Sequence, residues 1–194
     1  SSPRQTSHAT VVTAISISND GQYCVTGAGD ASLIVWDIGV FNEEKIQCHV
    51  VAHTESISTV AVSSQLEVVT SCDEGGTFIL SDLKTGTFLR KVKFTRPPNK
   101  MHISDLGFVV LIFVDLFEDD EEGFGKSGAA STASSQALSI GRRLTKVVLV
   151  DLGGRIIKEV ELEGKSTASY VISNMDSTEF VCVAQETKIF YIMR

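Results

Sequence analysis

The segment from His8 to Ile38 constrains the fold of this chain most. Within it, three short stretches are rich in β-branched and aromatic residues, the composition that strands favour. These stretches are 12–17, 23–26 and 33–36. Asn19-Asp20-Gly21 separates the first two and supplies residues that tolerate the positive φ of a tight hairpin. The segment is therefore predicted to form three antiparallel strands in a meander that closes on Trp36-Asp37.

A meander that follows a histidine and closes on Trp-Asp resembles one blade of a WD-repeat β-propeller. In blades of that family a histidine, a hydroxyl residue, an aspartate and the tryptophan form a chain of hydrogen bonds. The resemblance assigns these roles to His8, Thr26, Asp30 and Trp36. The indole N–H only donates, the hydroxyl both donates and accepts, and the imidazole links hydroxyl to carboxylate. We expect this structural hydrogen-bond network to fix the packing of the blade, and we predict no catalytic residue within it.

The pattern restarts at His53, which follows His8 by 45 residues, and a propeller blade takes about 40–45 residues. In this second unit the place of the aspartate is taken by Gly75 and that of the tryptophan by Ser81. Asp73 is a nearby substitute for the carboxylate. The same network is nevertheless not expected here, and the second unit is predicted to hold together by apolar packing alone.

Two further units follow, the last with only three strands, and the third is interrupted at 115–145. The four blades are predicted at about 8–51, 52–95, 96–162 and 163–194. The interruption is an acidic run followed by a Gly/Ser/Ala-rich stretch, a composition typical of disordered loops. Because known propellers have about 4–8 blades, the predicted fold class is all-β, with WD-repeat propeller blades in a partial or low-blade-number ring.

Several segments beyond the first unit resemble the C-terminal propeller of BEACH-domain proteins. These segments are AHTESISTVAVSSQLEVVTS, KTGTFLRKVKF, HISDLGFVV, VDLGGRIIKEVEL and FVCVAQETKIFYI. The resemblance implies a large cytoplasmic scaffold in vesicle trafficking, membrane dynamics or autophagy, whose propeller binds other proteins. It also implies further blades or a BEACH domain in a longer chain.

Charge and composition narrow the classes of partner and compartment. The net charge of −7 argues against nucleic acid or an anionic membrane surface as a direct partner, because both need a basic face. The longest apolar run, 106–114, is far shorter than the ~20 residues that span a bilayer, so no membrane insertion is expected. The four cysteines form no CxxC pair and the sequence has no N-glycosylation acceptor, which favours a cytoplasmic location.

Two groups of residues invite a ligand-binding interpretation. His49 and His53 lie four residues apart with Cys48 beside them. Such a pair converges on one face of a helix, but on this strand-to-loop stretch it need not. The stretch 123–127 ends in Gly-Lys-Ser, yet Asp120 stands where a phosphate loop needs its first glycine. We therefore predict no metal and no cofactor.

One short motif indicates a modification site. Arg142-Arg143-Leu144-Thr145 resembles a basophilic kinase site, which makes Thr145 a candidate phosphoacceptor.

The favoured function is a non-catalytic scaffold for protein–protein interaction, with the partner on a propeller face. The alternative is a substrate-recruiting adaptor of a ubiquitin ligase. Such adaptors often carry an arginine two residues after Trp-Asp, where this chain has Gly39. An enzyme is not expected, because no Ser/His/Asp spacing, nucleophile elbow or paired carboxylates stand out, and His102 is a single unsupported histidine.

Overall fold

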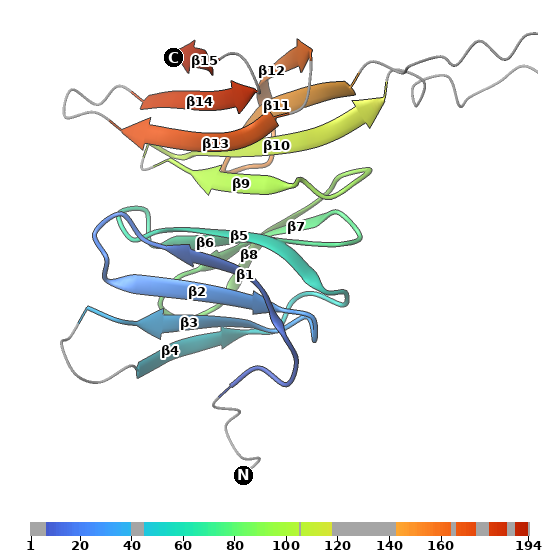
Figure 1. The fold of residues 1–194 in the computed structure, drawn as a ribbon. Coiled ribbons are helices and arrows are strands. Elements are labelled where there is room, and N and C mark those ends of the chain that lie inside the picture. Colours follow the sequence, from blue (N-terminus) through green and yellow to red (C-terminus); the bar gives the residue numbers. More distant parts are fainter. Residues whose placement is uncertain are drawn as a thin grey trace, which may run out of the picture.

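The computed structural model describes residues 7–39, 45–104, 106–117, 143–163, 166–173, 179–185 and 189–193, and all regular structure in these ranges is β-strand. The strands form four antiparallel sheets that follow one another along the chain (Figure 1). Sheet 1 contains β1 (Val12–Ile17), β2 (Tyr23–Ala28), β3 (Leu33–Asp37) and β4 (Lys45–Val50). Sheet 2 contains β5 (Ile57–Ser63), β6 (Val68–Asp73), β7 (Thr77–Asp82) and β8 (Phe88–Lys93).

Sheet 3 contains β9 (Lys100–Ile103), β10 (Phe108–Phe117), β11 (Arg143–Asp151) and β12 (Ile156–Glu163). Sheet 4 contains β13 (Ser166–Ser173), β14 (Glu179–Gln185) and β15 (Ile189–Met193). In each sheet the strands are neighbours in sequence order, which is the meander expected from tight hairpins. The predicted all-β class is therefore confirmed.

Sheets 1 and 2 repeat each other residue by residue. Every recorded pair between β1 and β2, and between β2 and β3, recurs 45 residues later in sheet 2. The irregularity near the start of β1 recurs as well, between Ile57 and Thr59 of β5. The repeat ends at the outer strand: Leu33 pairs with Val50, whereas Phe78 pairs with Val92. The loop before the fourth strand is therefore where the two units differ.

Apolar side chains fill the spaces between successive sheets. Sheet 1 packs on sheet 2 through a cluster that contains Val25, Leu33 and Val35 from the first sheet and Ile57 and Val60 from the second. Gly27 makes this approach close, since a β-carbon there would lie 2.5 Å from Ile57 Cγ2. The Thr13 hydroxyl adds a polar link between the sheets by donating to the Ile57 carbonyl at 2.5 Å.

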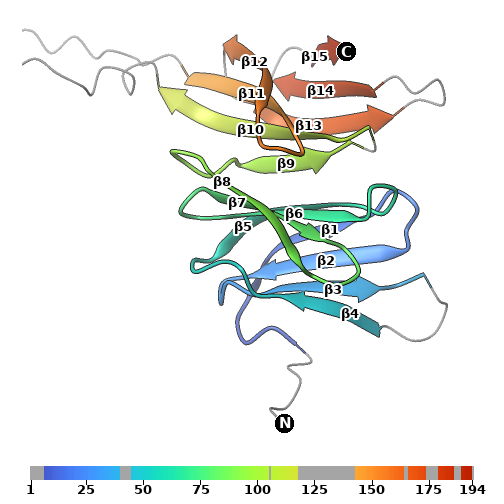
Figure 2. The ribbon, with the colours of Figure 1, turned by 180° about the vertical axis from the view of Figure 1, so that it is seen from behind.

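Sheet 3 is buried on both faces. Val109 and Leu111 of β10 join a cluster with Phe78 and Leu80 of sheet 2. The alternating residues of β10 point the other way and join a second cluster, on the face turned away from sheet 2. The innermost strand β9 lies against β13 of sheet 4. Sheet 1 and the last two sheets lie at opposite ends of the molecule in both views (Figures 1 and 2).

The predicted interruption at 115–145 is shorter at both ends. Strand β10 continues to Phe117 and β11 begins at Arg143, and these two residues pair with each other. Residues 118–142, including the acidic run and the stretch 123–127, lie outside the described residues. No helix in the described ranges is long and apolar enough to cross a membrane.

Candidate functional site: two histidine-centred networks

The first network joins three of the four residues assigned by the WD-repeat resemblance. His8 precedes β1, and its Nε2 lies 2.7 Å from Thr26 Oγ1 on β2. The Trp36 indole N–H, from β3, donates to the same oxygen at 2.8 Å. The Thr26 hydroxyl therefore accepts from the indole and donates to a neutral imidazole. In this way Thr26 connects the segment before β1 with β3.

The fourth residue, Asp30, is reached through a residue that the sequence analysis did not identify. His8 Nδ1 lies 2.6 Å from Ser32 Oγ, and this hydroxyl donates to Asp30 Oδ1 at 2.5 Å. The other carboxylate oxygen accepts from the backbone N–H of Ala9 at 2.7 Å. The hydrogen bond from the Ser32 hydroxyl is the largest effect that lowers the pKa of Asp30. The carboxylate therefore ties down both the turn before β3 and the segment that carries His8.

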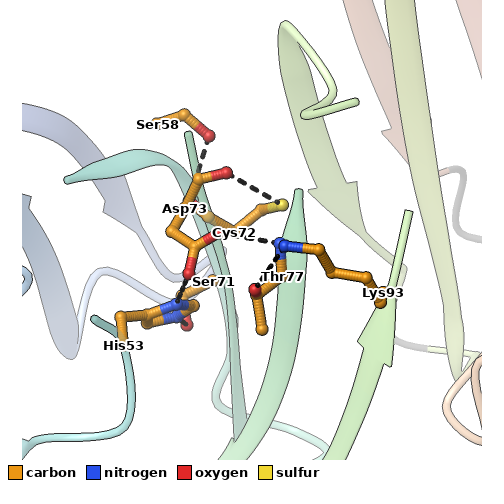
Figure 3. A network of polar contacts seen from close by, with 7 residues as sticks. All are labelled: His53, Ser58, Ser71, Cys72, Asp73, Thr77 and Lys93. Carbon is orange, nitrogen blue, oxygen red and sulfur yellow. Dashed lines mark hydrogen bonds and ion pairs between the residues drawn. The ribbon is translucent and has the colours of Figure 1, made fainter. Parts of the chain in front are cut away.

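A second network lies in sheet 2 and centres on His53 (Figure 3). His53 Nε2 lies 2.7 Å from Ser71 Oγ, and Nδ1 lies 3.0 Å from Asp73 Oδ2. The other oxygen of Asp73 accepts from the Thr77 backbone N–H at 2.7 Å. The prediction that this unit holds by apolar packing alone is therefore wrong.

The position of Asp73 explains why the second network forms. Asp73 follows Ser71 by two residues on β6, and side chains two apart on a strand point to the same face. Its carboxylate therefore reaches His53 from the strand itself, although Gly75 stands in the turn where sheet 1 has Asp30. The tryptophan has no counterpart: Ser81 is buried, and its hydroxyl has no hydrogen-bond partner within the described part of the chain.

Burial sets the electrostatics of both networks. The His53 side chain is buried, whereas His8 is only half-buried. Burial is the largest effect on each imidazole and lowers both pKa values, although a nearby carboxylate acts in the opposite direction. Burial alone would raise the pKa of Asp73, but hydrogen bonds from His53 and Thr77 outweigh it and lower this pKa. At pH 7 both imidazoles are therefore neutral, and the carboxylate of each network is ionised.

Ser71, His53 and Asp73 have the connectivity of a catalytic triad. The hydroxyl contacts one ring nitrogen and the carboxylate contacts the other. However, Ser71 lies inside β6 with 1% of its surface exposed, and its neighbour across the ladder is Val60, which packs against sheet 1. A nucleophile must be reachable by a substrate carbonyl. The arrangement therefore positions strands and does not present a reactive hydroxyl.

The residues weighed for metal binding do not converge. The described residues contain no group of three or more His, Cys, Asp or Glu side chains that could hold a metal ion. His53 uses both ring nitrogens within its own network. Burial and the nearby Asp82 raise the pKa of the Cys48 thiol to about 11, and burial and Asp73 raise that of Cys72 to about 12. Neither thiol is a thiolate at neutral pH, the form that binds metals.

The structure places the candidate phosphoacceptor where a kinase has no access. Thr145 lies on β11, pairs with Leu162 of β12 and is 0% exposed. A kinase must bind its substrate segment in its own cleft, and a central strand of a sheet is not available for that. The motif interpretation of Thr145 therefore does not fit the folded chain.

Comparison with known proteins agrees with this geometry. Residues 1–37 match the WD domain, G-beta repeat family. The first sheet is a propeller blade of the WD-repeat type. Over 96% of this chain and 94% of the other, the fold is also similar to the crystal structure of the computationally designed Ika4 protein, with a TM-score of 0.61 and 18% sequence identity. From here on, sheets 1 to 4 are called blades 1 to 4.

Proposed function

We propose that this chain is a non-catalytic scaffold that binds protein partners. The observation that carries the proposal is the enclosure of the His53 network, the one with the connectivity of a catalytic triad. Ser71 and Asp73, the two residues that would be most reactive in a catalytic triad, are each 1% exposed. WD-repeat propellers generally serve as interaction platforms, and this chain presents the same kind of blade.

The outer strand of blade 2 is the surface that we propose for the partner. Phe88 and Leu89 of β8 are 52% and 49% exposed, and the basic residues Arg90 and Lys91 follow directly. In a chain with a net charge of −7, this strand places apolar and positively charged groups side by side. β8 also ends its sheet, and no strand of the described part of the chain pairs with its outer edge, which could take up a further strand. A partner segment that combines apolar and acidic side chains would fit this edge.

Affinity purification from cells followed by reconstitution with the purified partner tests this proposal. The variant Phe88→Glu/Leu89→Glu should lower the affinity for that partner by about tenfold or more, since apolar anchors dominate binding. Ile156→Glu/Ile157→Glu on the outer strand β12 is the matched control, because its residues are exposed to a similar degree. The control should bind within about twofold of the wild type.

Two results would contradict the proposal. One is turnover of an ester or peptide substrate that Ser71→Ala abolishes while the protein stays folded. The other is partner binding that neither pair of charge substitutions changes.

The finer assignments extend the same proposal. The segments that resemble BEACH-domain proteins support a cytoplasmic scaffold in vesicle trafficking or membrane dynamics, and Gly39 after Trp36-Asp37 disfavours the ubiquitin-ligase adaptor. Mass spectrometry of the native protein from cells separates these alternatives from each other. A polypeptide that also contains a BEACH domain supports the first, and co-purified ligase subunits support the second.

A further inference from the structure

The outer strand of blade 2 lies in a basic stretch of an acidic chain. Residues 84–104 contain six lysine or arginine residues and no aspartate or glutamate, although the net charge of the chain is −7. Lys91 and Lys93 of β8 are both exposed. Lys84 and Lys146 each lie beside a carboxylate, whereas among the described residues neither lysine of β8 forms an ion pair. The positive charge of β8 is therefore not neutralised by the described part of the chain.

The register with β7 places the two lysines on one face of blade 2. Lys91 and Lys93 are two residues apart on β8, and their partners on β7 are two residues apart as well. The Lys93 ammonium donates to the Thr77 hydroxyl on this face at 3.2 Å (Figure 3). Val92 between the lysines points to the other face, where it packs against the apolar cluster shared with blade 3. The edge of β8 therefore presents cations on one side and an apolar surface on the other.

Strand β12 of blade 3 is the same kind of edge with the opposite charge. Both outer strands begin with two exposed apolar residues, and both have a register shift at that point. At its fourth and sixth positions β12 has Glu159 and Glu161, where β8 has Lys91 and Lys93. Glu159 also has a cation within its own blade, since its Oε2 lies 3.0 Å from Lys146 Nζ. An acidic segment is therefore attracted by β8 and repelled by β12.

We propose, on the basis of the function proposed above, that an extended segment of the partner adds to β8 as a further strand of blade 2, and that acidic and apolar side chains alternate along it. The acidic side chains lie beside Lys91 and Lys93, and the apolar ones lie on the side of Val92. Backbone hydrogen bonds supply affinity in such strand addition, and alternate side chains supply specificity. The lysines also repel the β8 edge of a second copy, because like charges directly opposite each other are unfavourable. The exposed Phe88 and Leu89 add an apolar contact that an edge built only to avoid pairing does not need.

An anionic lipid surface, the other common ligand of a basic strip, fits β8 less well. The Arg90 guanidinium donates to the Gly153 carbonyl at 3.4 Å, which places the start of β12 beside β8. A flat anionic surface that reached the lysines of β8 would also approach Glu159 and Glu161 of β12. A single extended segment can contact one outer strand without the other.

Fluorescence anisotropy with two labelled peptides of the same composition tests the proposal. In TEVEVEVT acidic and apolar residues alternate, and in TEEEVVVT they form blocks. The alternating peptide should bind the wild-type chain at least about tenfold more tightly, because only its carboxylates all lie on one face of a strand.

A pair of charge reversals locates the binding site. Lys91→Glu/Lys93→Glu should weaken the binding of the alternating peptide by about tenfold or more, because two attractions become repulsions. Lys45→Glu/Lys158→Glu, on the outer strands β4 and β12, is the matched control, since both residues are exposed and the net charge changes equally. The control should bind within about twofold of the wild type. Circular dichroism checks that both variants keep the β-fold.

Hydrogen exchange distinguishes strand addition from contact through side chains alone. Amides of β8 should gain protection when the alternating peptide is bound, and amides of β12 should not. Equal affinity for both peptides overturns the proposal, as does binding that the β8 charge reversals leave unchanged or that protects no amide of β8. Sedimentation with phosphatidylserine vesicles tests the lipid alternative. Vesicle binding that Lys91→Glu/Lys93→Glu abolishes, without any binding of the alternating peptide, also overturns the proposal.

The failure of this inference can be told apart from the failure of the proposed function. If Phe88→Glu/Leu89→Glu lowers the affinity for the partner from cells but the alternating peptide does not bind, this inference is overturned and the proposed function stands. If substitutions on β8 leave the affinity for that partner unchanged, the proposed function fails and this inference fails with it.

Discussion

Blades 1 and 2 have the same strand register and the same histidine-to-hydroxyl link, yet they differ in burial. His8 contacts Thr26 and His53 contacts Ser71, each pair 18 residues apart. The link in blade 2 lies on the face that points toward blade 1, and the link in blade 1 lies on the equivalent face, which is turned away from blade 2. Blade 1 therefore covers the network of blade 2, which is enclosed. For blade 1 the described chain supplies no neighbour, and the network is half-buried.

A blade's own sequence therefore does not by itself decide how much its polar network contributes to stability. A buried hydrogen bond that is lost leaves desolvated groups without partners, whereas water replaces the partner at an exposed position. Blade 2 also closes its network with fewer residues, since Asp73 contacts the imidazole directly and Ser32 has no counterpart in that role. The neighbouring blade therefore determines how much the same motif contributes to the stability of the protein.

Replacing equivalent apolar residues on β5 and β1 should give the largest difference in the free energy of unfolding. Ile57→Ala should destabilise the protein by about 4 kcal/mol, because it opens a cavity between blades 1 and 2. Val12→Ala, at the equivalent position of β1, should cost less than about 0.5 kcal/mol, since Val12 is 47% exposed. Urea unfolding measures the loss of stability in both variants. Equal losses would mean that the two faces are covered alike.

Replacing the two histidines should give the next largest difference in the free energy of unfolding. His53→Ala should cost about 3 kcal/mol, because it leaves buried Ser71 and ionised Asp73 without their shared partner. His8→Ala should cost only about 1 kcal/mol, because water can reach the groups that it leaves. Chemical denaturation with each variant and with wild type measures the difference. A larger loss for His8→Ala would reverse the comparison.

Gly27 tests how closely blade 1 approaches blade 2. Gly27→Ala should destabilise the fold by about 2 kcal/mol, because the new β-carbon would lie 2.5 Å from Ile57 Cγ2. Combining it with Ile57→Ala removes the clashing group. Thermal unfolding of the single and double variants should therefore show a clearly less-than-additive loss. Additive losses would place the two residues out of contact.

The smallest effect is the dependence of stability on pH. Burial lowers the pKa of His53 below 6.5, so the unfolded chain takes up a proton at higher pH than the folded chain does. Stability is therefore fully present above pH 6.5 and is lost as the pH falls below it, by at most about 1.4 kcal/mol per pH unit for one histidine. His53→Gln should flatten this slope more than His8→Gln, in urea titrations from pH 7.5 to pH 5. A slope that only His8→Gln flattens would contradict the assignment.

Local sequence patterns were sufficient to predict the strands of blade 1. The stretch 12–17 coincides with β1, and the turn at 19–21 contains Gly21 with a φ of +69°. The histidine, hydroxyl and tryptophan of the first network follow from the same pattern. Ser32 was missed, although it comes two residues after Asp30, where a turn hydroxyl commonly contacts an aspartate.

The second network was missed because its carboxylate moved from the turn to the strand. Gly75 and Ser81 stand where blade 1 has its aspartate and its tryptophan, and they therefore predict that the network is lost. The equal spacing of His8 to Thr26 and of His53 to Ser71 indicates instead that the histidine-to-hydroxyl link is kept. The exposure of Ile15 and Ile17 had no signal of its own, because their pattern is that of any buried strand. Thr145 likewise has a kinase motif around it, and only the ladder with Leu162 shows that it is enclosed.

Solvent access to the imidazoles of His8 and His53 can be compared in one sample. Nitrogen-15 labelling of histidine allows NMR to follow the ring N–H of each residue. We expect the Nδ1–H of His53, which faces Asp73 at 3.0 Å, to exchange slowly with water at pH 7. The ring N–H of His8 should exchange too fast to observe. Similar exchange at both rings, or faster exchange at His53, would contradict the claim that the neighbouring blade determines the burial of the motif.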